Sequence, residues 1–220
     1  MKILILTSTS TSYSIKRLIE EGEKRNHEMI TENPVDLMTY ISSTTRGYDM
    51  TYRKSTPDNG VKRVLSKSYD VIIPRFGGAN IFEFGASLTE HLSGNMRIPS
   101  TSWSIGLRTA SNKLMSAQAF SQNNVRTTKS VFAFKPRGNY SISRSGEKVE
   151  LTDEQQQLAI NAARAVCLEG VCAIDMMVCS KTDSTYVIEA NGNGSLNGIE
   201  KITGENVAGA IIDYAEKIGR

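Results

Sequence analysis

The chain contains few of the residues that cross-link or catalyse in small proteins. Its 220 residues include three cysteines, two histidines, five prolines and one tryptophan. The cysteines are odd in number, and Cys167, Cys172 and Cys179 match neither a CxxC pair nor a zinc spacing. We therefore expect reduced, mostly buried thiols in a cytoplasmic protein. Neither His27 nor His91 has an obvious Ser or Cys partner, so no catalytic triad is predicted and both are expected at the surface.

Long apolar runs and an excess of one charge are also missing. The longest apolar runs are the length of a strand, so no membrane-spanning helix is predicted. Residues 3–6 are too short a stretch for the apolar region of a signal peptide. With 26 basic and 23 acidic residues, the net charge of +3 indicates neither a nucleic acid nor an acidic membrane as partner. The composition is that of an ordinary globular protein, with room for one large domain or two small ones.

Residues 1–100 are predicted to form an α/β domain. Apolar runs predict strands, and 3.6-residue periodicity predicts helices: strands at 2–7, 27–30, 69–75 and near 98, and helices after residue 12 and at 80–92. The Ser/Thr-rich turn at 8–12 is expected to cap the first helix, and the polar stretch at 39–59 to be surface loop with short structure. Strands that alternate with helices predict a parallel sheet covered on both faces.

Residues 101–220 are predicted to form a second, α+β domain. The expected elements are helices at 108–122, 152–167 and 206–217, and strands at 130–134, 171–178 and 185–190. The last two strands form an antiparallel hairpin, which a Gly/Asn-rich loop at 191–198 follows. The chain changes character abruptly near 135–137, and we treat this position as a seam.

The hairpin carries the strongest chemical signal. Asp175 is the only acid in an apolar strand, and a turn centred on Thr182 places it directly opposite Glu189. Asn191 returns to the same face by the two-residue period of a strand. Two facing carboxylates repel unless a cation lies between them, and three oxygen ligands without His or Cys indicate Mg²⁺ or Mn²⁺.

A simpler interpretation stays open for the hairpin and for two basic residues. Asp175 could bond a neighbouring backbone group, and Glu189 could lie at a strand end, because a one-residue slip in register would separate the acids. Lys113 could be a solvated surface charge. Arg75, just after a strand, could bind an acidic substrate or cap the loop, and we favour the cap.

Four segments in the same order resemble the ATP-grasp ligases. The branch they resemble most contains the ligase that adds glutamate to the C-terminus of a ribosomal protein, and we call it RimK-like. The segments are 13–20 (YSIKRLIE), 71–77 (VIIPRFG), 108–114 (RTASNKL) and 187–204 (VIEANGNGSLNGIEKITG). The resemblance implies a pre-ATP-grasp α/β domain at 1–100 and an ATP-grasp domain at 101–220.

The resemblance also implies a reaction. ATP phosphorylates a carboxylate, which can be a protein C-terminus, and the amine of an amino acid such as glutamate attacks the acyl phosphate. By the same resemblance, Asp175, Glu189 and Asn191 hold the divalent ions and Lys113 contacts the ATP phosphates. Arg137 and Asn139 face the reaction centre. Related ligases commonly form dimers or tetramers, so a homo-oligomer is compatible with the resemblance.

One departure from the family leaves the function open between two classes. The family's lid subdomain and the strands after it would lie between residues 131–134 and 137–139, which here almost touch. The first reading is a ligase whose central segment is missing from this chain. The second is a shortened, non-catalytic relative that binds a ligand or protein. An unrelated flavodoxin-like binding module would explain the first hundred residues but not the hairpin acids.

Overall fold

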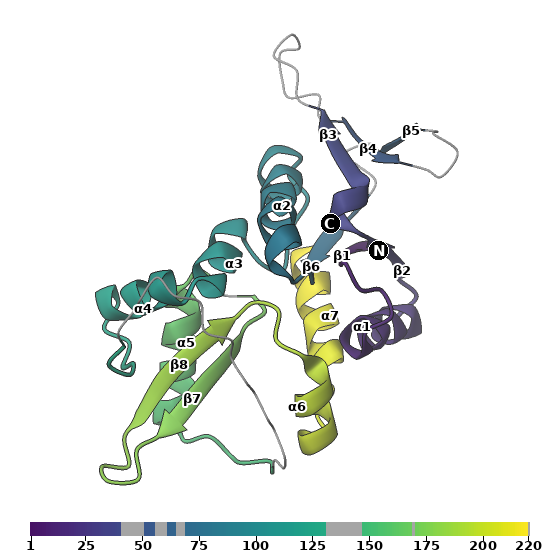
Figure 1. The fold of residues 1–220 in the computed structure, drawn as a ribbon. Coiled ribbons are helices and arrows are strands. Elements are labelled where there is room, and N and C mark those ends of the chain that lie inside the picture. The colour runs from purple at the N-terminus through teal and green to yellow at the C-terminus, as the bar shows by residue number, and fades with distance from the viewer. Residues whose placement is uncertain (41–50, 56–60, 65–68, 131–146, 169, 220) are drawn as a thin grey trace.

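A three-stranded parallel sheet forms the centre of the N-terminal half. The computed structural model describes residues 1–40, 51–55, 61–64, 69–130, 147–168 and 170–219. The strand order is β2 (Glu28–Glu32), β1 (Lys2–Leu6), β6 (Val71–Pro74). The expected fourth strand near residue 98 is only a single parallel bridge, from Ser100 to Ile72. The predicted α/β class with a parallel sheet is confirmed (Figure 1).

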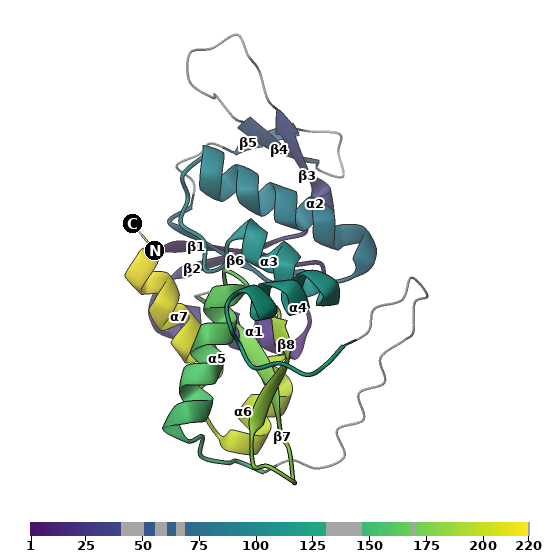
Figure 2. The ribbon, with the colours of Figure 1, turned by 90° about the vertical axis from the view of Figure 1, so that its left-hand side faces the viewer.

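Both faces of this sheet are buried, because alternate residues of β1 enter two different cores. Leu4 and Leu6 pack towards α2 (Ala79–Glu90) and α3 (Ser104–Ser111). Ile3 and Ile5 pack towards α1 (Tyr13–Lys24) and α7 (Val207–Ile218). Figure 2 shows α2 on one side of the sheet and α1 and α7 on the other. The last helix of the chain thus completes the core of the first unit.

The Ser/Thr-rich turn does not cap α1 through a side chain. Ser12 is the N-cap residue, but no backbone N–H of the helix bonds its hydroxyl. The hydroxyl of Ser14 instead accepts a hydrogen bond of 3.0 Å from the backbone N–H of Leu196. The expected side-chain cap was therefore wrong, and a hydroxyl in the first turn of α1 binds the start of another helix.

A second, antiparallel sheet lies where mainly loop was expected. After a 3-10 turn η1 (Pro34–Asp36), the strands β3 (Leu37–Tyr40), β4 (Thr51–Ser55) and β5 (Val61–Val64) pair in sequence order. Figure 1 shows this sheet at one end of the molecule, beyond α2. Charged residues interrupt β4 and β5, and β3 has only four residues, so the sequence pattern gave little sign of them.

The helical segment before residue 123 is two helices rather than one. After α2 the chain forms a π-helical turn η2 (His91–Asn95) and later α3, and α4 (Lys113–Gln122) begins after a break at Asn112. Asn112 has extended backbone angles (φ −107°, ψ 107°), and its side chain accepts hydrogen bonds from the N–H groups of Leu114 and Met115. This N-cap starts a new helix at Lys113. The prediction of one continuous helix at 108–122 was therefore wrong.

The remaining elements match the predicted order. Helix α5 (Asp153–Ala165) begins with a capping box between Thr152 and Gln155. The hairpin of β7 (Ala173–Val178) and β8 (Thr185–Asn191) follows, and then α6 (Leu196–Thr203) and α7. The predicted strand at 130–134 and the seam at 135–137 lie almost wholly outside the described residues. None of the helices described is long and apolar enough to cross a membrane.

Candidate metal and nucleotide site

The hairpin pairs Asp175 directly with Glu189, as predicted. A β-bulge produces this pairing. From Val178 to Met176 the strands pair in one register, and the extra residue Ile188 then shifts β8 by one position. Without the bulge, Asp175 would face Ile188 instead of Glu189.

The surroundings of Asp175 differ from those expected. Strand β7 is not a buried strand, since Met177 and Val178 are each 48% exposed. Partial burial, and then the charge of Glu189, raise the pKa of Asp175, while the charge of Lys113 lowers it. Burial accounts for the larger part of this rise in pKa, and repulsion between the paired acids adds to it; a cation bound between them would relieve that repulsion.

Asn191 lies two residues beyond Glu189, at the end of β8 and opposite Ala173. Its side-chain oxygen accepts a hydrogen bond of 2.8 Å from the backbone N–H of Asn193. A carbonyl oxygen has a second lone pair, so this bond orients the carboxamide and leaves one site for a cation.

Lys113 joins this group from a distant element. It is the first residue of α4, and its Nζ lies 3.1 Å from Oε2 of Glu189. Both residues line a cavity of about 190 Å³ between α4 and β8. Ala110, Ala117 and Phe120 give the cavity an apolar side, and Thr127, Thr128 and Ser130 give it hydroxyl groups. The structure therefore places an ammonium and a carboxylate beside a cavity of mixed polarity.

The donor set fits a hard divalent cation. Two facing carboxylates and a carboxamide provide oxygen ligands, which Mg²⁺ prefers, and they leave positions open for phosphate and water. In the described part of the chain, no three His, Cys, Asp or Glu side chains cluster as a metal site. A cation here would thus have two acidic ligands from the hairpin and further ligands from a bound nucleotide.

Other predicted residues have different outcomes. Arg137 and Asn139 lie outside the described residues. His91 is buried (6% exposed) rather than at the surface, and burial lowers its pKa. The side chain of His27 is only 10% exposed and lies 2.7 Å from Glu216, so the surface prediction was wrong for both histidines.

The cysteines were only partly predicted. All three are free thiols, as expected. Cys167 is exposed, and Cys172 and Cys179 are partly buried, so the expectation of mostly buried thiols was wrong.

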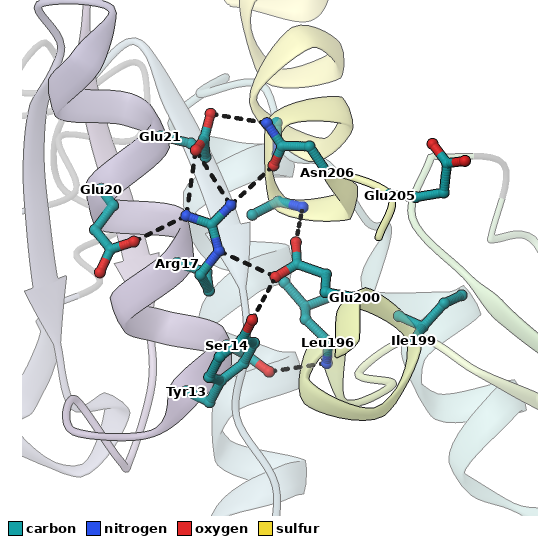
Figure 3. Close-up of polar contacts among 12 residues, drawn as sticks. Tyr13, Ser14, Arg17, Glu20, Glu21, Leu196, Ile199, Glu200, Glu205 and Asn206 are labelled. Carbon is teal, nitrogen blue, oxygen red and sulfur yellow. Dashed lines mark hydrogen bonds and ion pairs between the residues drawn. The ribbon is translucent and has the colours of Figure 1, made fainter. Parts of the chain in front are cut away.

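An ion-pair cluster that the sequence analysis missed connects α1 to α6 and α7 (Figure 3). We call Tyr13, Arg17, Glu21, Glu200 and Asn206 the α1–α6 cluster. Arg17 donates hydrogen bonds to Glu200 (3.0 Å), Glu21 (3.2 Å) and Asn206 (3.0 Å), and Tyr13 donates to Glu200 (3.0 Å). The two glutamate side chains are 6% and 7% exposed. The cluster therefore holds the helix that follows the Asn191 loop against the first helix of the chain.

Hydrogen bonds lower the pKa of both glutamates in the cluster. The bond from Lys24, and then the bond from Asn206, lower the pKa of Glu21 to about 2. Burial opposes the same shift at Glu200, but bonds from the Ala208 backbone N–H and from Tyr13 lower its pKa as well. Both residues are therefore carboxylates at neutral pH.

Two family models match this chain, one in each half. The RimK pre-ATP-grasp domain matches residues 1–107, and the RimK-like ATP-grasp domain matches residues 123–215. The chain belongs to the RimK-like ATP-grasp family. Relatives that share these domains are named ligases, which indicates that the chain is an enzyme.

A curated relative matches almost the whole chain. The probable alpha-L-glutamate ligase of Haemophilus influenzae (strain 86-028NP) is 24% identical, with 98% of this chain and 97% of the relative covered. The alignment spans 302 positions against the 220 residues of this chain, so at least 82 positions contain no residue of it. This difference agrees with the expectation that a segment of the RimK-like fold is missing here.

Solved structures of ATP-grasp ligases share the fold. The macrocyclase MdnB of Microcystis aeruginosa MRC superposes with a TM-score of 0.72 at 14% identity, covering 98% of this chain and 99% of the other. The ATP-grasp ligase PsnB in complex with minimal precursor, Mg and ADP gives a TM-score of 0.66 at 10% identity, with 98% of each chain covered. At these identities the similarity establishes the ATP-grasp fold alone.

Proposed function

We propose that the protein is an ATP-dependent carboxylate–amine ligase. The observation that carries the proposal is that Lys113 and Glu189 line one cavity, with Lys113 Nζ 3.1 Å from Glu189 Oε2, and that Asp175 pairs with Glu189 in the hairpin. An ammonium beside paired carboxylates suits a nucleotide whose phosphates are bridged to the protein through a divalent cation. Family membership supports the same assignment.

Each residue of the site has a role in this proposal. Asp175, Glu189 and Asn191 would hold Mg²⁺ or Mn²⁺, which neutralises phosphate charge when bound. Lys113 binds the nucleotide phosphates, so its ion pair with Glu189 holds both side chains at the cavity in the absence of ligand. Arg137 and Asn139 are assigned to the reaction centre by family resemblance.

The proposed reaction has two steps. A carboxylate oxygen of the acceptor attacks the γ-phosphorus of ATP, and the bond to ADP breaks to give an acyl phosphate. The amine of an amino acid then attacks the acyl carbon, phosphate leaves, the amine loses a proton, and an amide bond remains. Positioning and charge neutralisation supply most of the catalysis, so no nucleophilic side chain is needed.

Glutamate and a peptide C-terminus are the first substrates to test, because a relative is named a probable alpha-L-glutamate ligase. The experiment measures ADP release with ATP, Mg²⁺ or Mn²⁺, glutamate and a short peptide with a free C-terminus. Wild-type protein should release ADP only with a divalent cation, and Glu189→Gln should reduce the rate by about 100-fold or more. Mass spectrometry should show the peptide heavier by one residue.

Glu205→Gln is a matched control. Glu205 also forms an ion pair with a lysine, Lys148, at 2.7 Å, but it lies on the surface between α6 and α7. This variant should retain the wild-type rate. Wild-type activity in Glu189→Gln would contradict the metal assignment, and absence of cation-dependent ADP release from wild type would contradict the ligase.

A second candidate function is that of a non-catalytic binding module. The observation in its favour is the alignment of 302 positions to a chain of 220 residues, which leaves part of the family fold without a counterpart. This candidate predicts that a peptide or a magnesium–nucleotide binds in calorimetry, while no ADP forms over hours. Turnover of ATP coupled to amide formation would exclude it.

A further inference from the structure

Arg75 is a buried cation at the carboxyl end of the parallel sheet. It follows β6 directly and is 5% exposed. Burial lowers the pKa of its guanidinium to about 10, so the group still carries a charge at neutral pH. Among the described residues no carboxylate is paired with it, and its Nε has no hydrogen-bond partner. Burying a charge is costly, and the partner that the described residues provide is a neutral carbonyl, which indicates a role beyond packing.

The guanidinium bonds the loop that follows the metal-site hairpin. Arg75 Nη2 donates a hydrogen bond of 2.6 Å to the backbone carbonyl of Gly194, which is 119 residues further along the chain. In the opposite direction, Asn193 Nδ2 donates a bond of 2.9 Å to the carbonyl of Phe76. Two reciprocal bonds thus join the end of β6 to the loop at residues 192–195.

The same loop also orients the side chain of Asn191, the last residue of β8. The backbone N–H of Asn193 donates to the side-chain oxygen of Asn191 at 2.8 Å, so the orientation of that carboxamide depends on where Asn193 lies. A charged donor forms a stronger hydrogen bond to a carbonyl than a neutral one. The bond from Arg75 to Gly194 therefore restrains the residue next to Asn193.

The far end of the loop is anchored as well. Leu196, the first residue of α6, donates its N–H to Ser14, and Arg17 binds Glu200 one turn further on (Figure 3). The loop at 192–195 is therefore fixed by α6 at one end and by Arg75 from the side.

We propose that Arg75 is a positioning residue that sets the metal affinity of the site. By holding the Gly194 carbonyl it keeps the loop, and with it the Asn191 carboxamide, in the orientation that places an oxygen beside Asp175 and Glu189. This inference rests on the proposed function, because it takes Asn191 as a cation ligand. Arg75 itself contacts neither the cation nor the reacting groups in this proposal.

The test compares Arg75→Met and Arg75→Lys with wild type by two measurements. The first is hydrogen exchange of the backbone amides at residues 191–196, followed by mass spectrometry without ligand. The second is the Mg²⁺ concentration that gives half-maximal ADP release. For Arg75→Met we expect faster exchange confined to the loop and a Mg²⁺ midpoint raised by about 10- to 100-fold, with a smaller change in kcat at saturating Mg²⁺. Lysine keeps one charged donor and should recover part of both effects.

Arg25→Met is the matched control for a lost arginine. Arg25 bonds Asp213 and Glu216 on α7 and does not line the cavity. It should leave loop exchange and the Mg²⁺ midpoint unchanged. Asn193→Ala removes the reciprocal bond to Phe76 and should shift the Mg²⁺ midpoint in the same direction as Arg75→Met.

Three outcomes separate the possibilities. Wild-type loop exchange and a wild-type Mg²⁺ midpoint in Arg75→Met would overturn the proposal. A raised KM for the amine or the carboxylate at an unchanged Mg²⁺ midpoint would overturn it too, since Arg75 would then bind substrate. If wild type shows no cation-dependent turnover, the proposed function fails. The hydrogen-exchange measurement does not depend on turnover, so unchanged loop exchange in Arg75→Met would still refute the restraint by Arg75.

Discussion

Replacing Arg17 with methionine tests the α1–α6 cluster directly. The guanidinium reaches Glu200, Glu21 and Asn206 at 3.0–3.2 Å, and it joins α1 to α6 and to the start of α7. Methionine keeps most of the aliphatic stem and removes every donor. Two carboxylates that are 6% and 7% exposed then lose their shared cation.

The expected loss of stability follows from what each carboxylate retains. Removing one partner of a fully buried pair costs about 3–5 kcal/mol. Glu21 retains Lys24 and Asn206, and Glu200 retains Tyr13 and the backbone N–H of Ala208, so the remaining penalty is smaller. We expect Arg17→Met to lower the free energy of unfolding by about 2–3 kcal/mol and the melting temperature by roughly 5–10 °C.

Urea unfolding at pH 7, followed by circular dichroism, measures this loss. Arg25→Met serves as the comparison, because its acidic partners Asp213 and Glu216 are more exposed and it should cost about 1 kcal/mol or less. The double variant Arg17→Met/Glu200→Gln should lose less than the sum of the two single variants. A loss for Arg17→Met no larger than that for Arg25→Met would refute the assignment of a cation shared by two buried carboxylates.

Three further predictions concern pH, packing and thiol chemistry. The pKa of Glu21 is about 2 in the folded protein against an ordinary 4.5, so its contribution to stability is present above pH 4.5 and is lost as the pH falls towards 2. In Glu21→Gln, the urea midpoint should therefore depend less on pH over this range. A Cβ at Gly106 would lie 2.1 Å from a backbone oxygen, so Gly106→Ala should lower stability by about 1–3 kcal/mol, whereas Gly198→Ala, with open space around it, should not. Hydrogen bonding lowers the pKa of Cys179, and burial raises that of Cys172 to about 11, so iodoacetamide at pH 8 should label Cys179 before Cys172, as peptide mass mapping would show. Equal labelling, or wild-type stability of Gly106→Ala, would contradict the corresponding statement.

The pairing of the hairpin acids was predicted correctly from the sequence, but for an incomplete reason. The prediction assumed a turn centred on Thr182. Near the turn the strands pair Val178 with Thr185, and continuing this register would place Asp175 opposite Ile188. The bulge at Ile188 brings Glu189 opposite Asp175 instead. A bulge depends on how both strands twist and pack, and alternation within one strand does not reveal it.

Other features were missed for one of two reasons: the sequence signal was weak, or the residues in contact lie far apart in the sequence. The break at Asn112 was readable, since Asn is a favoured N-cap, but the helical periodicity continues across it. The strands β3 to β5 contain mostly polar residues. In the α1–α6 cluster, Arg17 and Glu200 are 183 residues apart, and no single-segment pattern connects them.

The candidate site was predicted only in part from the sequence. The hairpin residues and Lys113 were proposed from residue type, spacing and resemblance, and the structure brings Lys113 to Glu189, while their roles as metal and phosphate ligands stay predictions. Arg75 was read as a loop cap. It does bond a loop carbonyl, but that of Gly194 rather than one in its own loop. The division into domains at residue 100 stays a prediction, and α7 packs on the first unit whichever boundary is drawn.

The position of α7 affects how the chain folds during synthesis on the ribosome. The sheet residues Ile3, Ile5, Val71 and Ile73 are covered in part by Ile211, Ile212 and Ala215. During synthesis this apolar face therefore stays partly uncovered until residues 207–218 have been translated. Contacts between residues so far apart in sequence also close slowly. The N-terminal half, although its strands are made first, becomes fully folded only when the last helix arrives.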